Sequence, residues 1–335
     1  MRPYLLLLIL PFAAASQAAQ YCVSSDAVLR TALMAAAQSP EADQIRFVRS
    51  TIALNGNVDP GIKVEGDLQL RGGYAIGCAS RASEKHFTRI NGNDYRINLL
   101  MRGAADLDVE QMHFYGLDQL VVGDNIAEPQ GAYGEVRITR SAFREFRNGP
   151  IFTLLRHDLR ISNSLFADNE AGVSVEGFYN SNVGISTRID LINCTVVQND
   201  FGVQVLSGST GANTSPPSIV NSIISGNLYA DLALDQPTIV RHSMYRTLAL
   251  SGQGALHSSS YANLSSAPML DSNFLPRPLS PAIDSGDDSV IGYPISVIGY
   301  TITPPDFAGN PRKRGLHVDR GALEVQPLVV VFPFP

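Results

Sequence analysis

The stretch LRISNSLFADNEAGVSV, residues 159–175, occurs in three versions along this chain. The second version, IDLINCTVVQNDFGVQV, covers 189–205, and a weaker third, PSIVNSIISGNLYADLA, covers 217–233. The three align without gaps and share two asparagine positions, the first at Asn163, Asn193 and Asn221 and the second at Asn169, Asn199 and Asn227. A repeat of roughly two dozen residues, with loops of variable length between copies, is typical of a solenoid.

The repeat predicts an all-β fold built as a parallel β-helix. Each copy alternates apolar and polar residues in short runs, which indicates strands. Strands this short cannot bury their apolar face alone, so successive copies must stack into a continuous core. Stacking would place equivalent asparagines above one another, where amides can bond along the stack and Asn tolerates a left-handed bend. A β-sandwich is the alternative, but the two-residue hairpin turns that it needs are scarce.

The pattern extends in both directions along the chain. Residues 136–149 are a further copy with Arg140 at the first asparagine position, and weaker alternating runs begin at Leu68, Ile97, Leu107 and Ile239. We therefore expect roughly seven to nine coils. The strongest helix pattern is SDAVLRTALMAAAQ at 25–38, with Ser25 or Asp26 as its N-cap. Because solenoid ends expose the core, we expect residues 22–50 to cover one end and the segment after Leu279 the other.

The first 18 residues have the pattern of a secretory signal peptide. Arg2 is followed by the apolar run 5–12 and the small residues 13–19, and we place the cut after Ala18. A retained anchor is the alternative, but spanning a bilayer needs roughly 18 or more apolar residues. We therefore expect a secreted, periplasmic or cell-envelope protein with no membrane span after signal removal.

Export places the three cysteines in an oxidising compartment. Cys22 lies just after the cut, Cys78 lies in a glycine-rich segment, and Cys194 falls inside an apolar strand pattern. We predict a Cys22–Cys78 disulfide, which would tie the mature N-terminus to the first coils. Cys194 is then expected as a buried free thiol, the usual state of a small apolar cysteine.

Composition excludes several functional classes. The 335 residues contain 25 Lys plus Arg against 31 Asp plus Glu, a net charge of −6. Neither a nucleic-acid-binding scaffold nor a polybasic membrane-surface segment fits this balance. With 44% hydrophobic and 17% charged residues, the chain is expected to pack a core and not to be disordered.

Three C-terminal motifs add a resemblance to a known family. They are LSPAIDSG at 279–286, DFAGNPR at 306–312 and VDRGALE at 318–324. This region is similar to the choice-of-anchor Q domain of exported bacterial proteins, and the repeat resembles right-handed parallel β-helix proteins of the pectate-lyase-like superfamily. The segment 68–81 also resembles the N-terminal part of such chains. The resemblance implies an exported bacterial β-helix with a role in polysaccharide contact, and it carries over no catalytic residue.

This resemblance and the repeat together divide the chain into four parts. They are a signal peptide at 1–18, a β-helix with its N-terminal cap at 19–278, an irregular C-terminal cap at 279–326, and a tail at 327–335.

One outward-facing column is the candidate ligand-binding site. Lyases that cleave acidic polysaccharides neutralise a carboxylate with cations and remove the adjacent proton with a base. Arg137, Arg160 and Asp190 each stand three positions before the first asparagine position of their copies, so we expect them to align. The arginines could bind a carboxylated sugar, together with the nearby residues Arg156, His157, Asp158 and Asp168. The alternative is charge pairing across strands, with Asp190 offsetting Arg160.

Other chemistry-bearing patterns are weaker. Glu145 and Asp168 align on neighbouring copies as a carboxylate pair for hydrolysis, with solvated turn residues as the alternative. The acidic run 284–288 is expected to form a turn held by Asx hydrogen bonds and not a calcium loop. The histidines lack metal-ligand spacing, so we predict no metal site.

These observations lead to a functional expectation with alternatives. We expect an exported scaffold that binds a polysaccharide or cell-surface component without catalysis and without a cofactor. The enzymatic alternative is a polysaccharide lyase or glycoside hydrolase acting on an acidic polysaccharide, and calcium would enter only in the lyase. A purely structural role in the envelope is the third possibility.

Overall fold

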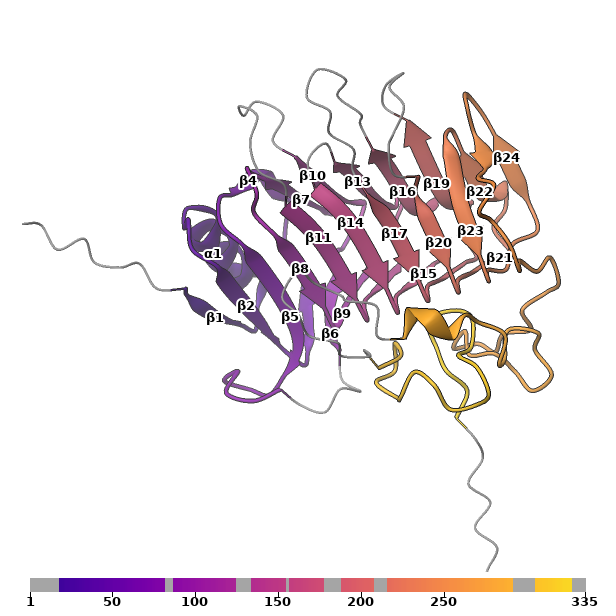
Figure 1. Cartoon of the computed structure of the whole chain (residues 1–335). Helices are drawn as coiled ribbons and strands as arrows, with labels where there is room; N and C mark the ends of the chain where they lie inside the picture. Colours follow the sequence, from indigo (N-terminus) through magenta and orange to yellow (C-terminus); the bar gives the residue numbers. More distant parts are fainter. Residues whose placement is uncertain are drawn as a thin grey trace, which may run out of the picture.

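The chain forms a right-handed parallel β-helix, as the repeat predicts (Figure 1). The computed structural model describes residues 18–81, 87–124, 134–154, 157–177, 188–207, 216–291 and 305–326. From residue 43 to residue 234, each turn of the chain adds one strand to each of three parallel sheets, here named sheets A, B and C. The signal peptide and the tail at 327–335 lie outside the described residues, apart from Ala18.

The three sheets run side by side along the solenoid. The described part of sheet A contains ten strands, which are β1 (Gln20–Val23), β2 (Asp43–Val48), β5 (Leu68–Tyr74), β8 (Leu107–Glu110), β11 (Gly134–Thr139), β14 (His157–Ser162), β17 (Ile189–Ile192), β20 (Ser218–Val220), β23 (Pro237–Arg241) and β25 (Ala255–Leu256). Sheet B contains seven, which are β3 (Thr51–Ala53), β6 (Thr88–Asn91), β9 (Met112–Tyr115), β12 (Ala142–Arg144), β15 (Leu165–Ala167), β18 (Thr195–Val197) and β21 (Ile223–Ser225). Sheet C contains eight, which are β4 (Val58–Val64), β7 (Arg96–Met101), β10 (Gln119–Asp124), β13 (Pro150–Leu154), β16 (Ala171–Gly177), β19 (Phe201–Ser207), β22 (Ala230–Leu234) and β24 (Leu248–Leu250).

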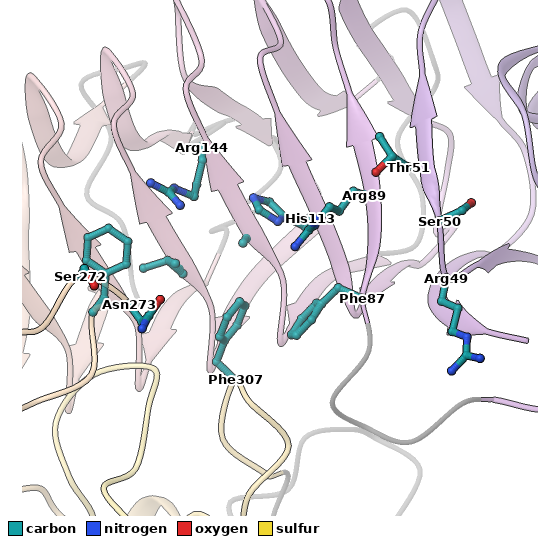
Figure 2. Close-up of a pocket in the computed structure, with 13 residues that line it drawn as sticks. Arg49, Ser50, Thr51, Phe87, Arg89, His113, Arg144, Ser272, Asn273 and Phe307 are labelled. Carbon is teal, nitrogen blue, oxygen red and sulfur yellow. The ribbon is translucent and has the colours of Figure 1, made fainter.

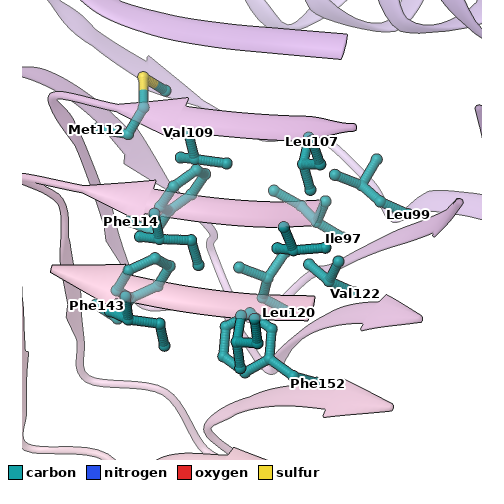
Figure 3. Close-up of a cluster of buried hydrophobic side chains, with 14 of the residues drawn as sticks. Ile97, Leu99, Leu107, Val109, Met112, Phe114, Leu120, Val122, Phe143 and Phe152 are labelled. Carbon is teal, nitrogen blue, oxygen red and sulfur yellow. The ribbon is translucent and has the colours of Figure 1, made fainter. Parts of the chain in front are cut away.

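The core is a set of apolar rows that run parallel to the solenoid axis. Alternate residues of each strand point inward, and parallel register stacks them on the equivalent residues of the next coil. Phe114, Phe143 and Phe166 form one such row, with ring centroids 5.4 and 4.8 Å apart. Side chains from sheets A and C meet them in the interior (Figure 3). This stacking buries the apolar faces that single repeats leave open.

The two asparagine positions have different structural roles. Asn163, Asn193 and Asn221 have φ between 48° and 54°, so the first position makes the left-handed bend between sheets A and B. The second position forms an amide ladder between sheets B and C. The Nδ2 of Asn169 donates to the Oδ1 of Asn199 at 3.0 Å, and the Nδ2 of Asn199 donates to the Oδ1 of Asn227 at 3.0 Å.

Glycine beside the ladder allows this close stacking. A Cβ on Gly172 would lie 2.9 Å from the Nδ2 of Asn199, and a Cβ on Gly202 would lie 2.8 Å from the Nδ2 of Asn227. Both glycines stand three residues after a ladder asparagine, which explains their shared place in the first two copies.

The N-terminal end is closed as predicted. Helix α1 (Asp26–Ala37) begins at the N-cap Ser25 and packs Leu29 and Leu33 onto the core. A disulfide joins Cys22 in β1 to Cys78, with their Cα atoms 5.6 Å apart. The predicted helix and disulfide are both confirmed, and Cys194 is a buried free thiol.

The C-terminal segment is irregular, as expected, but lies along the side of the solenoid. The described part contains one short 3-10 helix, η1 (Asp288–Val290), and packs on the outer face of sheet B, alongside the solenoid (Figure 1). Phe274 and Ala282 join the outer side chains of sheet B in a second apolar cluster. The backbone N–H of Ala322 donates to the Oγ1 of Thr195 at 2.8 Å. This differs from the expectation that the segment covers the far end of the solenoid.

The three C-terminal motifs hold this segment together. The Asp319 carboxylate accepts the backbone N–H groups of Asp284 and Val325, and the Asp306 carboxylate accepts those of Asn310 and Glu324. These carboxylates therefore replace the backbone pairing that a strand would provide. The run 284–288 is a turn of the expected kind, since Asp287 accepts the N–H of Ser289 at 2.8 Å.

No helix in the described ranges is long and apolar enough to cross a bilayer.

Candidate functional site

The column predicted from the sequence exists on sheet A. Parallel register places Arg137 beside Arg160 and Arg160 beside Asp190 on consecutive strands. Each cation is already engaged: Arg137 pairs with Glu135 at 3.0 Å, and Arg160 lies 3.7 Å from Asp190. Arg188 adds a pair to Asp190 at 2.7 Å. The column therefore forms an ion-pair network of the kind expected from cross-strand charge pairing.

Of the other residues in that candidate set, Asp158 lies on β14 two residues before Arg160 and beside Glu135, whereas His157 and Asp168 lie apart from the two arginines. His157 is buried and its Nε2 is 2.9 Å from the carbonyl oxygen of Ala105. Asp158 accepts the backbone N–H of Arg188. Asp168 follows β15 at the end of sheet B and pairs with Arg144 at 2.6 Å. Arg156 lies outside the described residues.

Burial raises the pKa of two carboxylates in the sheet A network, those of Glu135 and Asp190. Desolvation raises the pKa of Asp190 above its ordinary value, against the lowering effect of Arg188 and Arg160. Desolvation likewise raises the pKa of Glu135, against Arg160 and Arg137. A network this dehydrated and internally neutralised leaves little free positive charge for a ligand.

A different row of residues lies on the outer face of sheet B, and its residues change from polar or cationic to buried along the solenoid. Register aligns one residue from each strand into this row, which reads Thr51, Arg89, His113, Ala142, Leu165, Thr195 and Ile223. From Ala142 onward the row is buried, and the C-terminal segment packs on it. The first three residues are polar or cationic; Thr51 and Arg89 are exposed, and His113 is half-buried.

The part of this row from Thr51 to Leu165 forms the floor of a groove of about 490 Å³. The floor crosses five strands, β3 to β15, and the C-terminal segment forms a wall through residues 272–274 and Phe307. Figure 2 shows Arg144, His113, Arg89 and Thr51 in order across the strands, opposite the rings of Phe307 and Phe87. This groove, here called the sheet B groove, is our candidate functional site.

Positive charge dominates the sheet B groove. Arg49, Arg89 and Arg144 line it, and none of the described lining residues is acidic. Arg144 pairs with Asp168 and lies over the ring of Phe274 at 5.3 Å. Within the described ranges, Arg49 and Arg89 make no side-chain ion pair or hydrogen bond. Two guanidinium groups without a partner in this part of the chain therefore line the groove.

His113 lies between two of these cations. Arg89 is its register partner on β6, and Arg144 lies on the next strand, β12. The ring is tilted against Tyr115, with centroids 5.6 Å apart, and its Nε2 has no hydrogen-bond partner among the described residues. Burial, and then the charges of Arg89 and Arg144, lower the pKa of His113 to about 4. His113 is thus neutral near pH 7, and its unpaired Nε2 is buried.

An aromatic pair forms the wall opposite the cations. Phe87 and Phe307 stack with centroids 4.7 Å apart, which joins the loop before β6 to the C-terminal segment. Both rings are half-buried. Aromatic rings beside guanidinium groups favour ligands with an apolar face and an anionic substituent, such as acidic sugars.

The other residues considered for catalysis lie outside the sheet B groove. Glu145 and Asp168 adopt left-handed conformations after β12 and β15, at the corner between sheets B and C. No group of three or more His, Cys, Asp or Glu in the described residues has the arrangement of a metal site.

The feature of the sequence that could reveal the groove is a change of residue type at one repeat position of sheet B. Arg89 and His113 occupy the place that Leu165, Thr195 and Ile223 occupy in the clear repeats. The early coils are too irregular for that alignment to be read from the sequence, because the segment 74–88 interrupts the strand pattern. Sequence periodicity cannot predict the wall formed by the C-terminal segment, because that segment lies far along the chain from the strands it contacts.

Comparisons of the chain with protein-family models, with curated proteins and with solved structures found no match. The candidate site is therefore argued from its geometry alone.

Proposed function

We propose that this protein is exported and binds an acidic polysaccharide in the sheet B groove. The single observation that carries the proposal is the pair of guanidinium groups of Arg49 and Arg89, which have no ion-pair partner among the described residues and line an open groove with an aromatic wall. A guanidinium recognises carboxylate and sulfate groups through paired hydrogen bonds. The groove crosses parallel strands, so an extended chain can lie across their outer face.

The proposal also includes export of the protein and its membership of a family. The Cys22–Cys78 disulfide fits an oxidising compartment, and the signal pattern at 1–18 supplies a route. The three C-terminal motifs bind one another, and Phe307 of the second motif lines the groove. We propose on this basis that the chain belongs with choice-of-anchor Q proteins of the pectate-lyase-like superfamily.

Affinity electrophoresis tests the binding proposal. Gels containing polygalacturonate, alginate or hyaluronan should retard the protein, and a gel containing neutral dextran should not. Retardation should weaken as salt is added, because the contact is between charges. Arg89→Gln should abolish most of the retardation, whereas the control Arg147→Gln, which changes an exposed arginine outside the groove, should not. Equal mobility in every gel would refute the proposal.

A lyase is the second candidate, favoured by the neutral His113 between two arginines. Arg89 would pair with the substrate carboxylate and acidify the neighbouring C–H bond. The imidazole of His113 would take that proton, the C–H electron pair would form a carbon–carbon double bond, and the glycosidic C–O bond would break toward oxygen. The protonated imidazole or water would then protonate the leaving oxygen.

Product analysis separates the two candidates. A lyase would release unsaturated uronates, which absorb ultraviolet light, without added calcium, and His113→Gln would stop this release while Arg89-dependent binding persists. Binding of acidic polymers with no product from any of them identifies a scaffold without catalysis.

A further inference from the structure

The sheet B groove has two ends of different charge. One end, over β3 to β9, carries Arg49, Arg89 and the hydroxyl of Thr51. These two guanidinium groups have no ion-pair partner within the described residues. Across four strand spacings of about 4.8 Å, the groove is roughly 19 Å long, so the ends are distinct subsites.

The other end, over β12 and β15, is neutral. Its arginine, Arg144, is neutralised by Asp168 at 2.6 Å and covers the ring of Phe274. Ala142 and Leu165 form the floor there, and Ser272 and Asn273 present exposed polar side chains at the wall. A hydroxyl and an amide suit the hydroxyl groups of an uncharged sugar.

We infer that the groove selects a polysaccharide in which acidic sugars alternate with neutral ones, with the acidic sugar at Arg89 and its neutral neighbour at Asn273. This inference rests on the proposed function and narrows its ligand class. The acidic group is a carboxylate or a sulfate, since a guanidinium pairs with both.

Desolvation explains why a chain with an acid on every sugar binds less well. A second acidic group would reach the neutral end, where Asp168 already engages the nearby cation. Transferring that charge out of water without a new partner is costly, and Asp168 adds like-charge repulsion. A neutral sugar avoids both effects and gains hydrogen bonds from Asn273.

Calorimetric titration with octasaccharides of equal length tests this preference. Hyaluronan carries a carboxylate on every second sugar, κ-carrageenan a sulfate on every second sugar, and oligogalacturonate a carboxylate on every sugar; a chito-oligosaccharide serves as the neutral probe. We expect at least one alternating probe to bind ten times more tightly than oligogalacturonate. Comparison of the two alternating probes identifies the acidic group.

Two variants locate the subsites. Arg89→Gln should weaken every charged probe at least tenfold. Asn273→Lys places a cation at the neutral end, so it should raise the affinity for oligogalacturonate at least fivefold and leave the alternating probes nearly unchanged. Arg147→Gln, outside the groove, is the matched control and should alter neither.

The outcomes separate this inference from the proposed function. Oligogalacturonate binding as tightly as the alternating probes would overturn the inference and leave acidic-polysaccharide binding intact. An unchanged preference in Asn273→Lys would also overturn it. Failure of all three charged probes would remove the proposed function and this inference together.

Discussion

Cys194 occupies a serine position in the bend between sheets A and B. The residue after the first asparagine position is Ser141, Ser164, Ser222 or Ser243 in the other clear coils. Each serine hydroxyl donates to the carbonyl two residues earlier, and each also accepts a backbone N–H from the preceding coil. The Cys194 Sγ makes the weaker version of this contact, at 3.5 Å from the Ile192 oxygen.

Replacement of this cysteine therefore tests the serine column. Cys194→Ser should leave the free energy of unfolding unchanged or raise it by about 1 kcal/mol, because the hydroxyl completes the column. Cys194→Ala removes the acceptor and should be less stable than the serine variant. Urea unfolding of the three proteins measures their order of stability, and an alanine variant as stable as the serine variant would contradict a role for the hydroxyl column.

Burial raises the pKa of Cys194 to about 12, so the native thiol should also resist thiol reagents.

His113 offers a second test at the same scale, by nuclear magnetic resonance. Burial and the charges of Arg89 and Arg144 lower its pKa to about 4. Since this lies below the ordinary 6.5, its contribution to stability is complete above pH 6.5 and is lost as pH falls toward 4. Arg89→Gln removes one cation and should raise the His113 pKa. Titration of the wild-type ring near 6.5 would contradict the buried position between cations.

The elements of the fold show which sequence signals translate directly into structure. The second asparagine position could be predicted as a stack because amides one coil apart must meet when strands are in register. The first position was predicted to share this bonding, but Asn163 has no side-chain hydrogen bond and mainly provides the left-handed bend. The difference lies in the direction of the side chain at the bend, which spacing does not encode.

Removal of one amide from the ladder should therefore be costly. Asn199 accepts from Asn169 and donates to Asn227, and it also bonds the carbonyl oxygens of Phe166 and Val197. Asn199→Ala leaves these buried groups unpaired, so we expect a loss of about 3 kcal/mol or more. Asn148→Ala, which removes one exposed bond to Asp118, is the control and should cost about 0.5 kcal/mol or less. Similar midpoints in urea unfolding for both variants would disprove the structural role of the ladder.

At the scale of the whole molecule, the sequence predicted the solenoid and its N-terminal closure but not the functional face. Arg137 and Arg160 stood out because the repeat aligns them, yet they pair with Glu135 on β11 and with Asp106, the residue before β8. The sheet B groove needs Phe307 beside Phe87, a contact across most of the chain. Local periodicity contains no information about that contact.

The C-terminal segment concentrates buried charge where it closes the groove. Asp306, Asp319 and Glu324 are buried around one buried guanidinium, that of Arg312. Three carboxylates with one cation favour a protonated carboxyl group. Burial raises the pKa of Glu324 to about 7, with Asp319 adding to the effect and Arg312 opposing it.

The attachment of this segment should therefore weaken as pH rises. Because the folded pKa of Glu324 lies above its ordinary 4.5, the stabilising contribution of the protonated form is complete below pH 4.5 and is lost through pH 7, by about 3 kcal/mol. Hydrogen exchange of residues 306–326, corrected for intrinsic rates, should show easier opening at pH 8.5 than at pH 6. Glu324→Gln stays neutral and should remove this dependence, whereas Glu65→Gln, on the exposed surface of the N-terminal coils, should retain it. An opening free energy equal at both pH values in the wild type would show that Glu324 is ionised throughout.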